Sequence, residues 1–144
     1  MRRAAVVTGP IDPAAVMDEV RSREFGAVSM FIGTVRDTNE GRRVSSIDYS
    51  AYVPMAEAEL DRIMGEASEK FGVAAIVVEH RIGPLGLGDI SVAIAVAHEH
   101  RAPALEATSF LIERIKEQVP IWKLERYADG VAGWIDPTDL VARS

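Results

Sequence analysis

Two lysines, Lys116 and Lys123, lie seven positions apart in the segment KEQVPIWKLE, on either side of Pro120. Ammonium groups that are held close together and partly desolvated lower each other's pKa, which makes a lysine usable as a general base, general acid or nucleophile. Two lysines at this spacing can equally be surface residues whose aliphatic stems cover apolar side chains. The spacing alone favours this second interpretation, so further evidence is needed to assign chemistry to the pair.

The elements around the two lysines determine whether they can meet. Pro120 lacks an N–H and biases the residue before it toward extended backbone, so a predicted helix over residues 103–118 ends there and a strand follows. Lys116 falls at the edge of the apolar stripe of this helix. Because side chains alternate along a strand, Lys123 shares a face with Glu125 and can turn back toward Lys116. The predicted buried stripe of the helix consists of Leu105, Thr108, Ile112, Ile115 and Val119.

Further cationic residues follow the ends of other predicted elements. Arg36 comes directly after an apolar strand at residues 26–35, and His100 and Arg101 lie between a strand at 90–98 and the lysine helix. Arginine suits bidentate binding of phosphate or carboxylate, and a helix N-terminus favours anions. Each of these residues alone is more typical of a protein surface. Their shared placement at the ends of elements predicts a site for a small anionic substrate.

The histidines raise the alternative of a metal site. His98 and His100 alternate onto one strand face, and Glu79 or Glu99 could add an oxygen ligand. A zinc site usually has three or four ligands, and the chain has neither cysteine nor an HExxH motif, so we expect no metal. The chain also lacks a P-loop, a GxGxxG motif after a strand and a GxSxG motif, which disfavours nucleotide hydrolysis and serine chemistry.

Composition limits the remaining possibilities. The chain has 144 residues, a formal net charge of −6 and no cysteine. This length fits one globular domain, which we place at residues 1–136 with a tail at 137–144. The acidic balance argues against a nucleic-acid partner, and the lack of a long apolar run or signal peptide predicts a cytoplasmic protein with no membrane contact. Without cysteine, the chain cannot carry sulfur as a thiolate or persulfide.

The sequence predicts both strands and helices along the chain. The segment 26–35 is apolar on both faces, which predicts a central strand covered on both sides, and the polar segment 36–43 is predicted to be a mobile loop. Residues 128–130, Ala-Asp-Gly, predict a hairpin turn before a last strand through Trp134. The other predicted strands cover residues 4–8, 44–52, 74–78 and 90–98, and the other predicted helices cover residues 13–23 and 54–71.

Five motifs together make the chain resemble the large, catalytic subunit of molybdopterin synthase over nearly its whole length. The chain departs from the family pattern at Ser50, where many relatives carry glutamate. Its C-terminal segment matches no motif of the family, so no role is assigned to a basic residue there, such as Arg143. The motifs are FxGxVR at 31–36, YxxYxPMA at 49–56, HRxGxLxxGD at 80–89, HR at 100–101 and KxxxPIWKxE at 116–125.

This resemblance implies a specific reaction and architecture. Members of the family convert cyclic pyranopterin monophosphate, also called precursor Z, into molybdopterin by inserting the two sulfur atoms of its dithiolene. The sulfur arrives as a thiocarboxylate on the Gly-Gly C-terminus of a small ubiquitin-like subunit, and no cofactor is permanently bound. The implied fold is α+β, of the α/β-hammerhead type with an additional small antiparallel β subdomain. The implied assembly is a heterotetramer, in which a homodimer is flanked by two small subunits.

The resemblance also implies roles for individual residues. Lys116 and Lys123 match the two active-site lysines of the family, with Glu125 expected to orient a lysine and Phe31 to form pocket wall or core. We expect Lys116 to activate or protonate the reacting groups, and Lys123 to assist proton transfer and hold the end of the partner's tail. The residues expected to bind the cyclic phosphate, across a dimer interface, are Arg36, His100 and Arg101.

Two alternative functions remain open on the sequence alone. The first is a non-catalytic docking module that binds a ubiquitin-like sulfur-carrier protein through strand contacts with its extended tail. The second is an enzyme that forms a Schiff base between a lysine and a small carbonyl substrate. The first predicts partner binding without consumption of precursor, and the second predicts an adduct on Lys116 that borohydride can trap.

Overall fold

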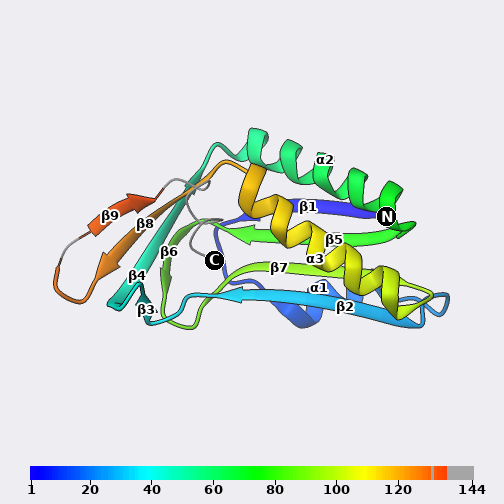
Figure 1. The fold of residues 1–144 in the computed structure, drawn as a ribbon, viewed down its shortest axis with the longest axis horizontal. Helices are drawn as coiled ribbons and strands as arrows, with labels where there is room; N and C mark the ends of the chain where they lie inside the picture. Colours follow the sequence, from blue (N-terminus) through cyan, green and yellow to red (C-terminus); the bar gives the residue numbers. More distant parts are fainter. Residues whose placement is uncertain (131, 136–144) are drawn as a thin grey trace.

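The computed structural model describes residues 1–130 and 132–135, and the predicted tail at 137–144 lies outside this range. In the described part of the chain, a main sheet of four strands lies between helices, and a second sheet of five strands extends from one end of it (Figure 1). In order across the main sheet, the strands are β1 (Arg2–Val7), β5 (Ala75–Arg81), β7 (Ile90–His98) and β2 (Ala27–Thr34). Strand β1 is parallel to β5, and the other neighbouring strands are antiparallel.

The position of β2 differs from the prediction of a central strand. In the described part of the chain, β2 pairs only with β7 and forms the edge of the sheet. Its apolar residues nevertheless contact helices on both faces: Phe31 packs in the core under α2 and α3, and Ile32 packs in the core on the side of α1. The apolar residues on both faces of β2 therefore indicate that helices cover both faces, and they do not show whether the strand lies at the centre or the edge of the sheet.

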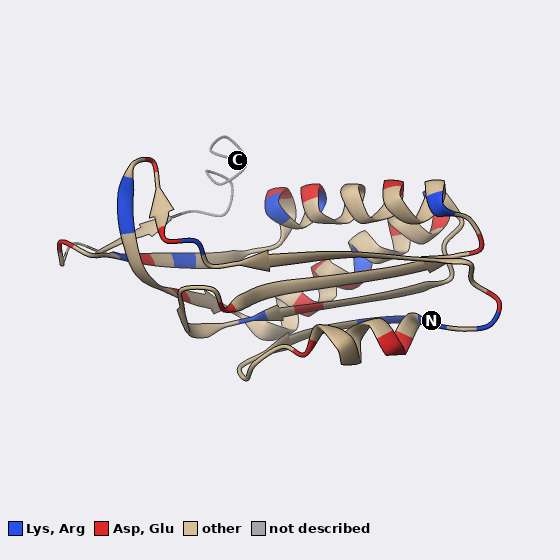
Figure 2. Cartoon of the chain, turned by 90° about the horizontal axis from the view of Figure 1, so that it is seen from below, with Lys and Arg blue, Asp and Glu red and all other residues tan. Residues whose placement is uncertain are grey.

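Within residues 1–130 and 132–135, three helices cover the two faces of the main sheet, with α2 and α3 on one face and α1 on the other (Figures 1 and 2). The carboxylate of Asp12 caps the first turn of α1 by accepting hydrogen bonds from two backbone N–H groups, and Gly72 ends α2 in the left-handed conformation, with φ of 68°. The helices are α1 (Pro13–Val20), α2 (Val53–Phe71) and α3 (Arg101–Gln118). None of these described helices has the length and apolar character needed to span a membrane.

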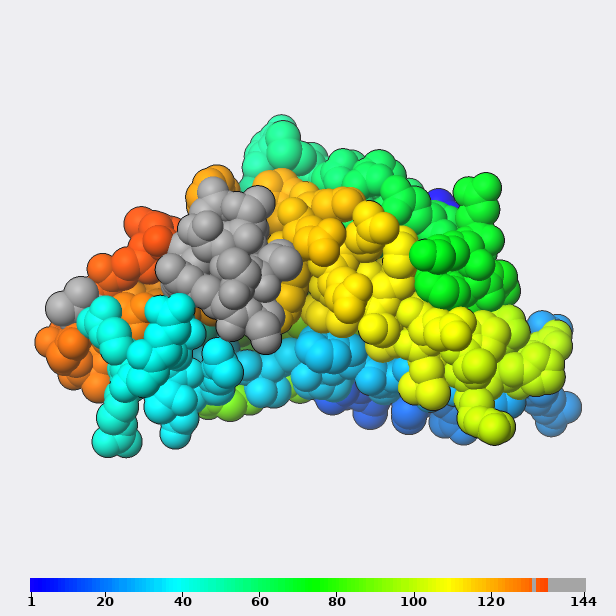
Figure 3. All heavy atoms as spheres, in the orientation of Figure 1, coloured from blue at the N-terminus to red at the C-terminus, as the bar shows by residue number. Residues whose placement is uncertain are grey.

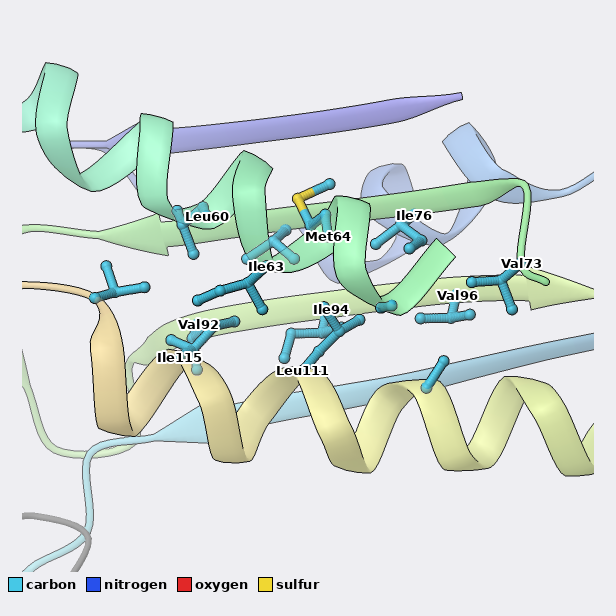
Figure 4. Packing of buried hydrophobic residues seen from close by; sticks show 14 of the residues in the cluster. Leu60, Ile63, Met64, Val73, Ile76, Val92, Ile94, Val96, Leu111 and Ile115 are labelled. Carbon is cyan, nitrogen blue, oxygen red and sulfur yellow. The ribbon is translucent and has the colours of Figure 1, made fainter. Parts of the chain in front are cut away.

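The main core lies between α2, α3 and the sheet (Figure 4). The side chains of β7 alternate between the two faces of the sheet: Val92, Ile94 and Val96 enter this core, and the small residues Ala93, Ala95 and Ala97 face α1. The buried stripe of α3 was predicted only in part, because Leu105 is 59% exposed. The buried residues of α3 are Ala104, Ala107, Thr108, Leu111 and Ile115.

The second sheet is antiparallel throughout and is built on one long strand, which has partners along both edges. Two of its strands lie where the sequence predicted none: β3 (Thr38–Asn39) falls in segment 36–43, which was predicted to be a mobile loop, and β6 (Gly83–Gly86) falls between the predicted strands at 74–78 and 90–98. One forms because Glu40 and Gly41, with φ of 52° and 80°, close a two-residue hairpin. The long strand is β4 (Arg42–Ala51), and the others are β3 (Thr38–Asn39), β6 (Gly83–Gly86), β8 (Ile121–Tyr127) and β9 (Ala132–Ile135). The α+β fold with a small antiparallel β subdomain is thereby confirmed.

Candidate functional site

A cavity of about 430 Å³ lies where the main sheet, the C-terminal half of α3 and the second sheet meet. Its volume falls within the usual range of small-molecule sites. Five of the residues selected from the sequence line it, and they come from β2, α3, β8 and the segment after β2. These residues are Phe31, Arg36, Lys116, Lys123 and Glu125.

The two lysines reach the cavity because the chain changes from helix to strand between them. Val119 has extended backbone, with φ of −81° and ψ of 123°, while its N–H still donates to the carbonyl of Ile115 at 3.1 Å. Strand β8 begins two residues later. The break expected at Pro120 is therefore present, and Lys123 turns back toward Lys116 as the alternation of side chains predicts.

The positive charges in the cavity act on one another. Burial, the charge of Lys123 and the charge of Arg36 all lower the pKa of Lys116. Lys116 is the more exposed of the two lysines, whereas the side chain of Lys123 is only 15% exposed. The cavity therefore combines an accessible lysine whose proton is held less tightly than usual with two neighbouring cations.

Glu125 is a buried carboxylate behind Lys123. Its side chain is 1% exposed, and its Oε1 lies 2.8 Å from Nζ of Lys123. Asn39 donates to both carboxylate oxygens, at 3.1 and 2.8 Å, and the hydroxyl of Tyr127 donates to Oε2 at 2.6 Å. Burial raises the pKa of Glu125, but the hydrogen bonds from Lys123, Tyr127 and Asn39 outweigh it, so the pKa is lowered and the group stays ionised.

Asn39 and Tyr127 were not predicted from the sequence to belong to the site. Tyr127 has the same parity in β8 as Lys123 and Glu125, so strict alternation would have placed it on their face. Asn39 gave no such signal, because its contact with Glu125 joins residues that are 86 positions apart in the chain.

The inner wall of the cavity contains neutral polar rings. His80 and Tyr49 pack edge to face, with ring centroids 5.2 Å apart. Burial lowers the pKa of His80 to about 4, so this ring is neutral near pH 7 and its Nδ1 donates to the carbonyl of Arg81 at 2.9 Å. Burial also raises the pKa of Tyr49, although a hydrogen bond with Ser91 opposes this effect. The wall therefore offers aromatic surface and hydrogen bonds without adding charge.

Two of the selected residues, His100 and Arg101, lie far from this cavity within the same chain. They are exposed at the first turn of α3, about 22 Å along the helix axis from Lys116 at 1.5 Å per residue. Figure 3 shows the start of α3 and the second sheet at opposite ends of the molecule. The ring of His100 lies 5.9 Å from that of His98, and among the described residues no three histidines or carboxylates form a group suited to a metal ion.

The arrangement suits the binding of a small anion and the transfer of protons next to it. Arg36 and the lysines supply positive charge where negative charge is bound or develops, and the low local dielectric of a partly closed cavity strengthens their effect. Lys116 can donate or accept a proton, since its pKa is lowered. Phe31, Tyr49 and His80 offer flat surfaces for a planar ring.

Several known proteins are similar to this chain. The family model described as MoaE protein matches residues 6–118. The molybdopterin synthase catalytic subunit of Bacillus subtilis (strain 168) is 44% identical over 130 residues, which cover 90% of this chain and 83% of that protein. The crystal structure of molybdopterin synthase from Staphylococcus aureus has a TM-score of 0.86 at 41% identity, covering 91% of this chain and 95% of that chain.

A more distant structure shares the fold. It is the protein–protein complex of subunits 1 and 2 of the molybdopterin-converting factor from Helicobacter pylori 26695, with a TM-score of 0.74 at 23% identity. The similarity covers 92% of this chain and 88% of that chain.

Proposed function

Because this chain belongs to the MoaE protein family, we propose that its cavity is where two sulfur atoms are transferred to cyclic pyranopterin monophosphate to form the dithiolene of molybdopterin. The chain is a sulfur-transferring enzyme, as its relatives are. One observation carries the assignment of the reaction to the cavity: Lys116, Lys123 and Arg36 come from three separate segments and line the same space. The cytoplasmic location expected from the sequence belongs to the same proposal.

The sulfur must come from another molecule, because this chain contains no cysteine. The proposed donor is the C-terminal thiocarboxylate of a small ubiquitin-like partner that ends in Gly-Gly, and no cofactor is permanently bound. Glycine has no side chain, so such a tail is narrow enough to enter a cavity that must also hold a pterin. The H. pylori neighbour, which was solved as a complex of two subunits, supports a partner of this kind.

The groups in the cavity suggest a division of roles. In each transfer, the thiocarboxylate sulfur forms a bond to a pterin side-chain carbon while a carbon–oxygen bond at that carbon breaks, and the oxygen leaves as water or stays on the opened phosphate. Water then cleaves the bond between that sulfur and the partner's carbonyl carbon, leaving a carboxylate on the partner and a thiolate on the pterin. Lys116 moves protons to or from the reacting groups, for which its lowered pKa suits it. Lys123 holds the negative end of the tail, and Arg36 binds the cyclic phosphate.

The remaining cations require a second copy of the chain. His100 and Arg101 lie about 22 Å from Lys116 along the axis of α3, so they cannot reach a substrate at the lysines of their own chain. We propose that they bind the phosphate in the cavity of the other protomer of a homodimer, which two small partners flank in the complete assembly. Closed twofold dimers are the commonest symmetric assemblies, which supports this arrangement.

The test is to mix the purified chain with a thiocarboxylated small subunit and precursor Z, and then to assay molybdopterin. Formation of molybdopterin that requires all three components is the expected result, and a partner ending in an ordinary carboxylate is the matched control. Partner binding without consumption of precursor would indicate a docking module and contradict the proposal. A borohydride-trapped adduct on Lys116 would indicate Schiff-base chemistry instead.

A further inference from the structure

A short hairpin outside the lysine motif reaches the buried carboxylate behind Lys123. The two-residue turn between β3 and β4 has positive φ at both Glu40 and Gly41, and it sets Asn39 opposite Arg42. Figure 3 shows this hairpin, in cyan, at the same end of the molecule as β8 and β9, in orange. The turn therefore fixes the backbone of the residue whose amide contacts Glu125.

Donors from two strands satisfy the Glu125 carboxylate. Asn39 on β3 donates to both of its oxygens, while Lys123 and Tyr127 on β8 supply one contact each. A carboxylate that is 1% exposed cannot replace a lost donor with bulk water, so each contact affects both its ionisation and its orientation. Asn39 and Tyr127 hold the Glu125 carboxylate in an orientation in which its Oε1 faces the ammonium of Lys123.

Arg42 connects the hairpin to β8 a second time. Its guanidinium lies 3.6 Å from the centroid of the Tyr127 ring, a cation–π contact. It also forms an ion pair with Asp129, at 3.0 Å, in the turn after β8. The hairpin thus contacts Glu125 directly through Asn39 and indirectly through the ring of Tyr127.

We propose that Asn39 and Tyr127 are positioning residues of the sulfur-transfer site, which hold the Glu125 carboxylate against Lys123 and thereby fix the Lys123 ammonium in the cavity. The consequence for catalysis rests on the function proposed for Lys123. The contacts themselves belong to the free chain and can be tested without any partner or substrate.

The competing explanation is that these contacts only attach the hairpin to the sheet. Ser45 provides a matched control, because its hydroxyl donates to the carbonyl of Arg126 at 3.0 Å and so also joins β4 to β8, without touching Glu125. Ser45→Ala removes a link of the same kind between the same sheet regions. A purely structural role predicts similar effects for Ser45→Ala, Asn39→Ala and Tyr127→Phe.

The first measurement follows the ionisation of the Glu125 carboxyl in the isolated chain by carbon-detected NMR with labelled glutamate, the signal being assigned with Glu125→Gln. Among the described residues, the titratable groups that act on this carboxyl are Lys123 and Tyr127 from β8 and Tyr49 from β4. Asn39→Ala and Tyr127→Phe should each increase the acid dissociation pKa of Glu125, corresponding to at least about a tenfold change in its ionisation equilibrium, the effect of losing a charged hydrogen bond. Ser45→Ala should leave it unchanged.

The second measurement is steady-state formation of molybdopterin from thiocarboxylated partner and precursor. Asn39→Ala and Tyr127→Phe should lower kcat about tenfold, leave KM for the partner near the wild-type value, and move the acid limb of the pH profile upward together with the Glu125 titration. Tyr127→Phe removes only a hydroxyl, so it remains informative if Asn39→Ala folds poorly.

Two results would overturn the inference. An unchanged Glu125 titration in both variants would show that Asn39 and Tyr127 do not hold the carboxylate. A shifted titration with wild-type kcat and pH profile would show that the contacts do not serve the reaction. If the wild-type chain forms no molybdopterin, the proposed function fails, and the holding of Glu125 is then decided by the carboxyl titration alone.

Discussion

Nζ of Lys123 lies 2.8 Å from Oε1 of Glu125, in an ion pair whose acidic partner is almost completely buried. Because this ion pair joins Lys123 to Glu125, the two lysines of the cavity are suited to different roles. Lys123 is tied to a fixed carboxylate, which suits it to hold a negative group in place, whereas Lys116 is more exposed and its pKa is lowered. Proton transfer is therefore assigned mainly to Lys116, and orientation of the sulfur donor mainly to Lys123.

Replacing either cavity lysine with alanine should reduce molybdopterin formation about 100-fold or more, the usual contribution of a positioned proton-transfer group. The measurement is the initial rate with saturating partner and precursor, with circular dichroism as the check on folding. Lys70 on α2, the one lysine outside the motif, is the control, because its ammonium lies over the rings of Phe71 and Phe110, away from the cavity. Wild-type turnover by Lys116→Ala would remove the proposed proton-transfer role.

The pKa of Lys116 should rise when Lys123 is replaced with methionine, because the charge of Lys123 is one of the causes that lower it. Between its lowered folded value and its unfolded value, the unfolded chain binds more protons at this residue, so stability rises with pH across that window. Nitrogen-detected NMR of the three lysines measures the titration directly. A Lys116 titration that Lys123→Met leaves unmoved would show that the two amines do not share the cavity in solution.

Glu125→Gln should destabilise the chain near neutral pH by about 2 kcal/mol, since it removes the charged partner of Lys123. The folded pKa of Glu125 lies below its ordinary value of 4.5, so this stabilisation is present above that value and is lost as the pH falls through the folded pKa. Urea unfolding at neutral and acidic pH compares the two chains, with the exposed Glu113→Gln as control. A stability difference that does not shrink in acid would contradict the assigned ionisation.

Mixing two inactive variants should restore activity if the cations at the start of α3 serve the other protomer. A mixed dimer of one Lys116→Ala chain and one Arg101→Ala chain contains one intact site and one site that lacks both residues. Random exchange makes about half of the dimers mixed, so about one quarter of wild-type activity is expected. The assay is molybdopterin formation after co-refolding, with sedimentation to confirm dimers. No recovery from dimers that have exchanged would contradict action across the dimer.

The site was predictable where local rules determine it. Pro120 ends the helix, and strand alternation places Lys123 and Glu125 on one face, so the main part of the lysine arrangement could be read from ten consecutive residues. Asn39 could not be found in this way, because it reaches Glu125 only after the hairpin folds against a strand far along the chain. Contacts between distant segments depend on strand pairing, which local spacing does not specify.

The errors in the predicted fold have a related origin. Leu105 was assigned to the buried stripe because it is large and apolar, yet α3 buries the small residues Ala104 and Ala107, which allow closer packing against the sheet. Strand β2 is apolar on both faces because helices cover both, but it lies at the edge of the main sheet in the described part of the chain. The periodicity of the sequence therefore predicted where helices and strands form better than it predicted which elements and residues pack against one another.

The most direct test is a single-turnover reaction in which the partner's thiocarboxylate carries radioactive sulfur and the chain is in excess over precursor Z. The wild-type chain should move the label from the partner onto the pterin, and the Lys116→Ala, Lys123→Ala double variant should bind both substrates while the label stays on the partner. Transfer of the label by the double variant at the wild-type rate would contradict the assignment of sulfur transfer to the two-lysine cavity.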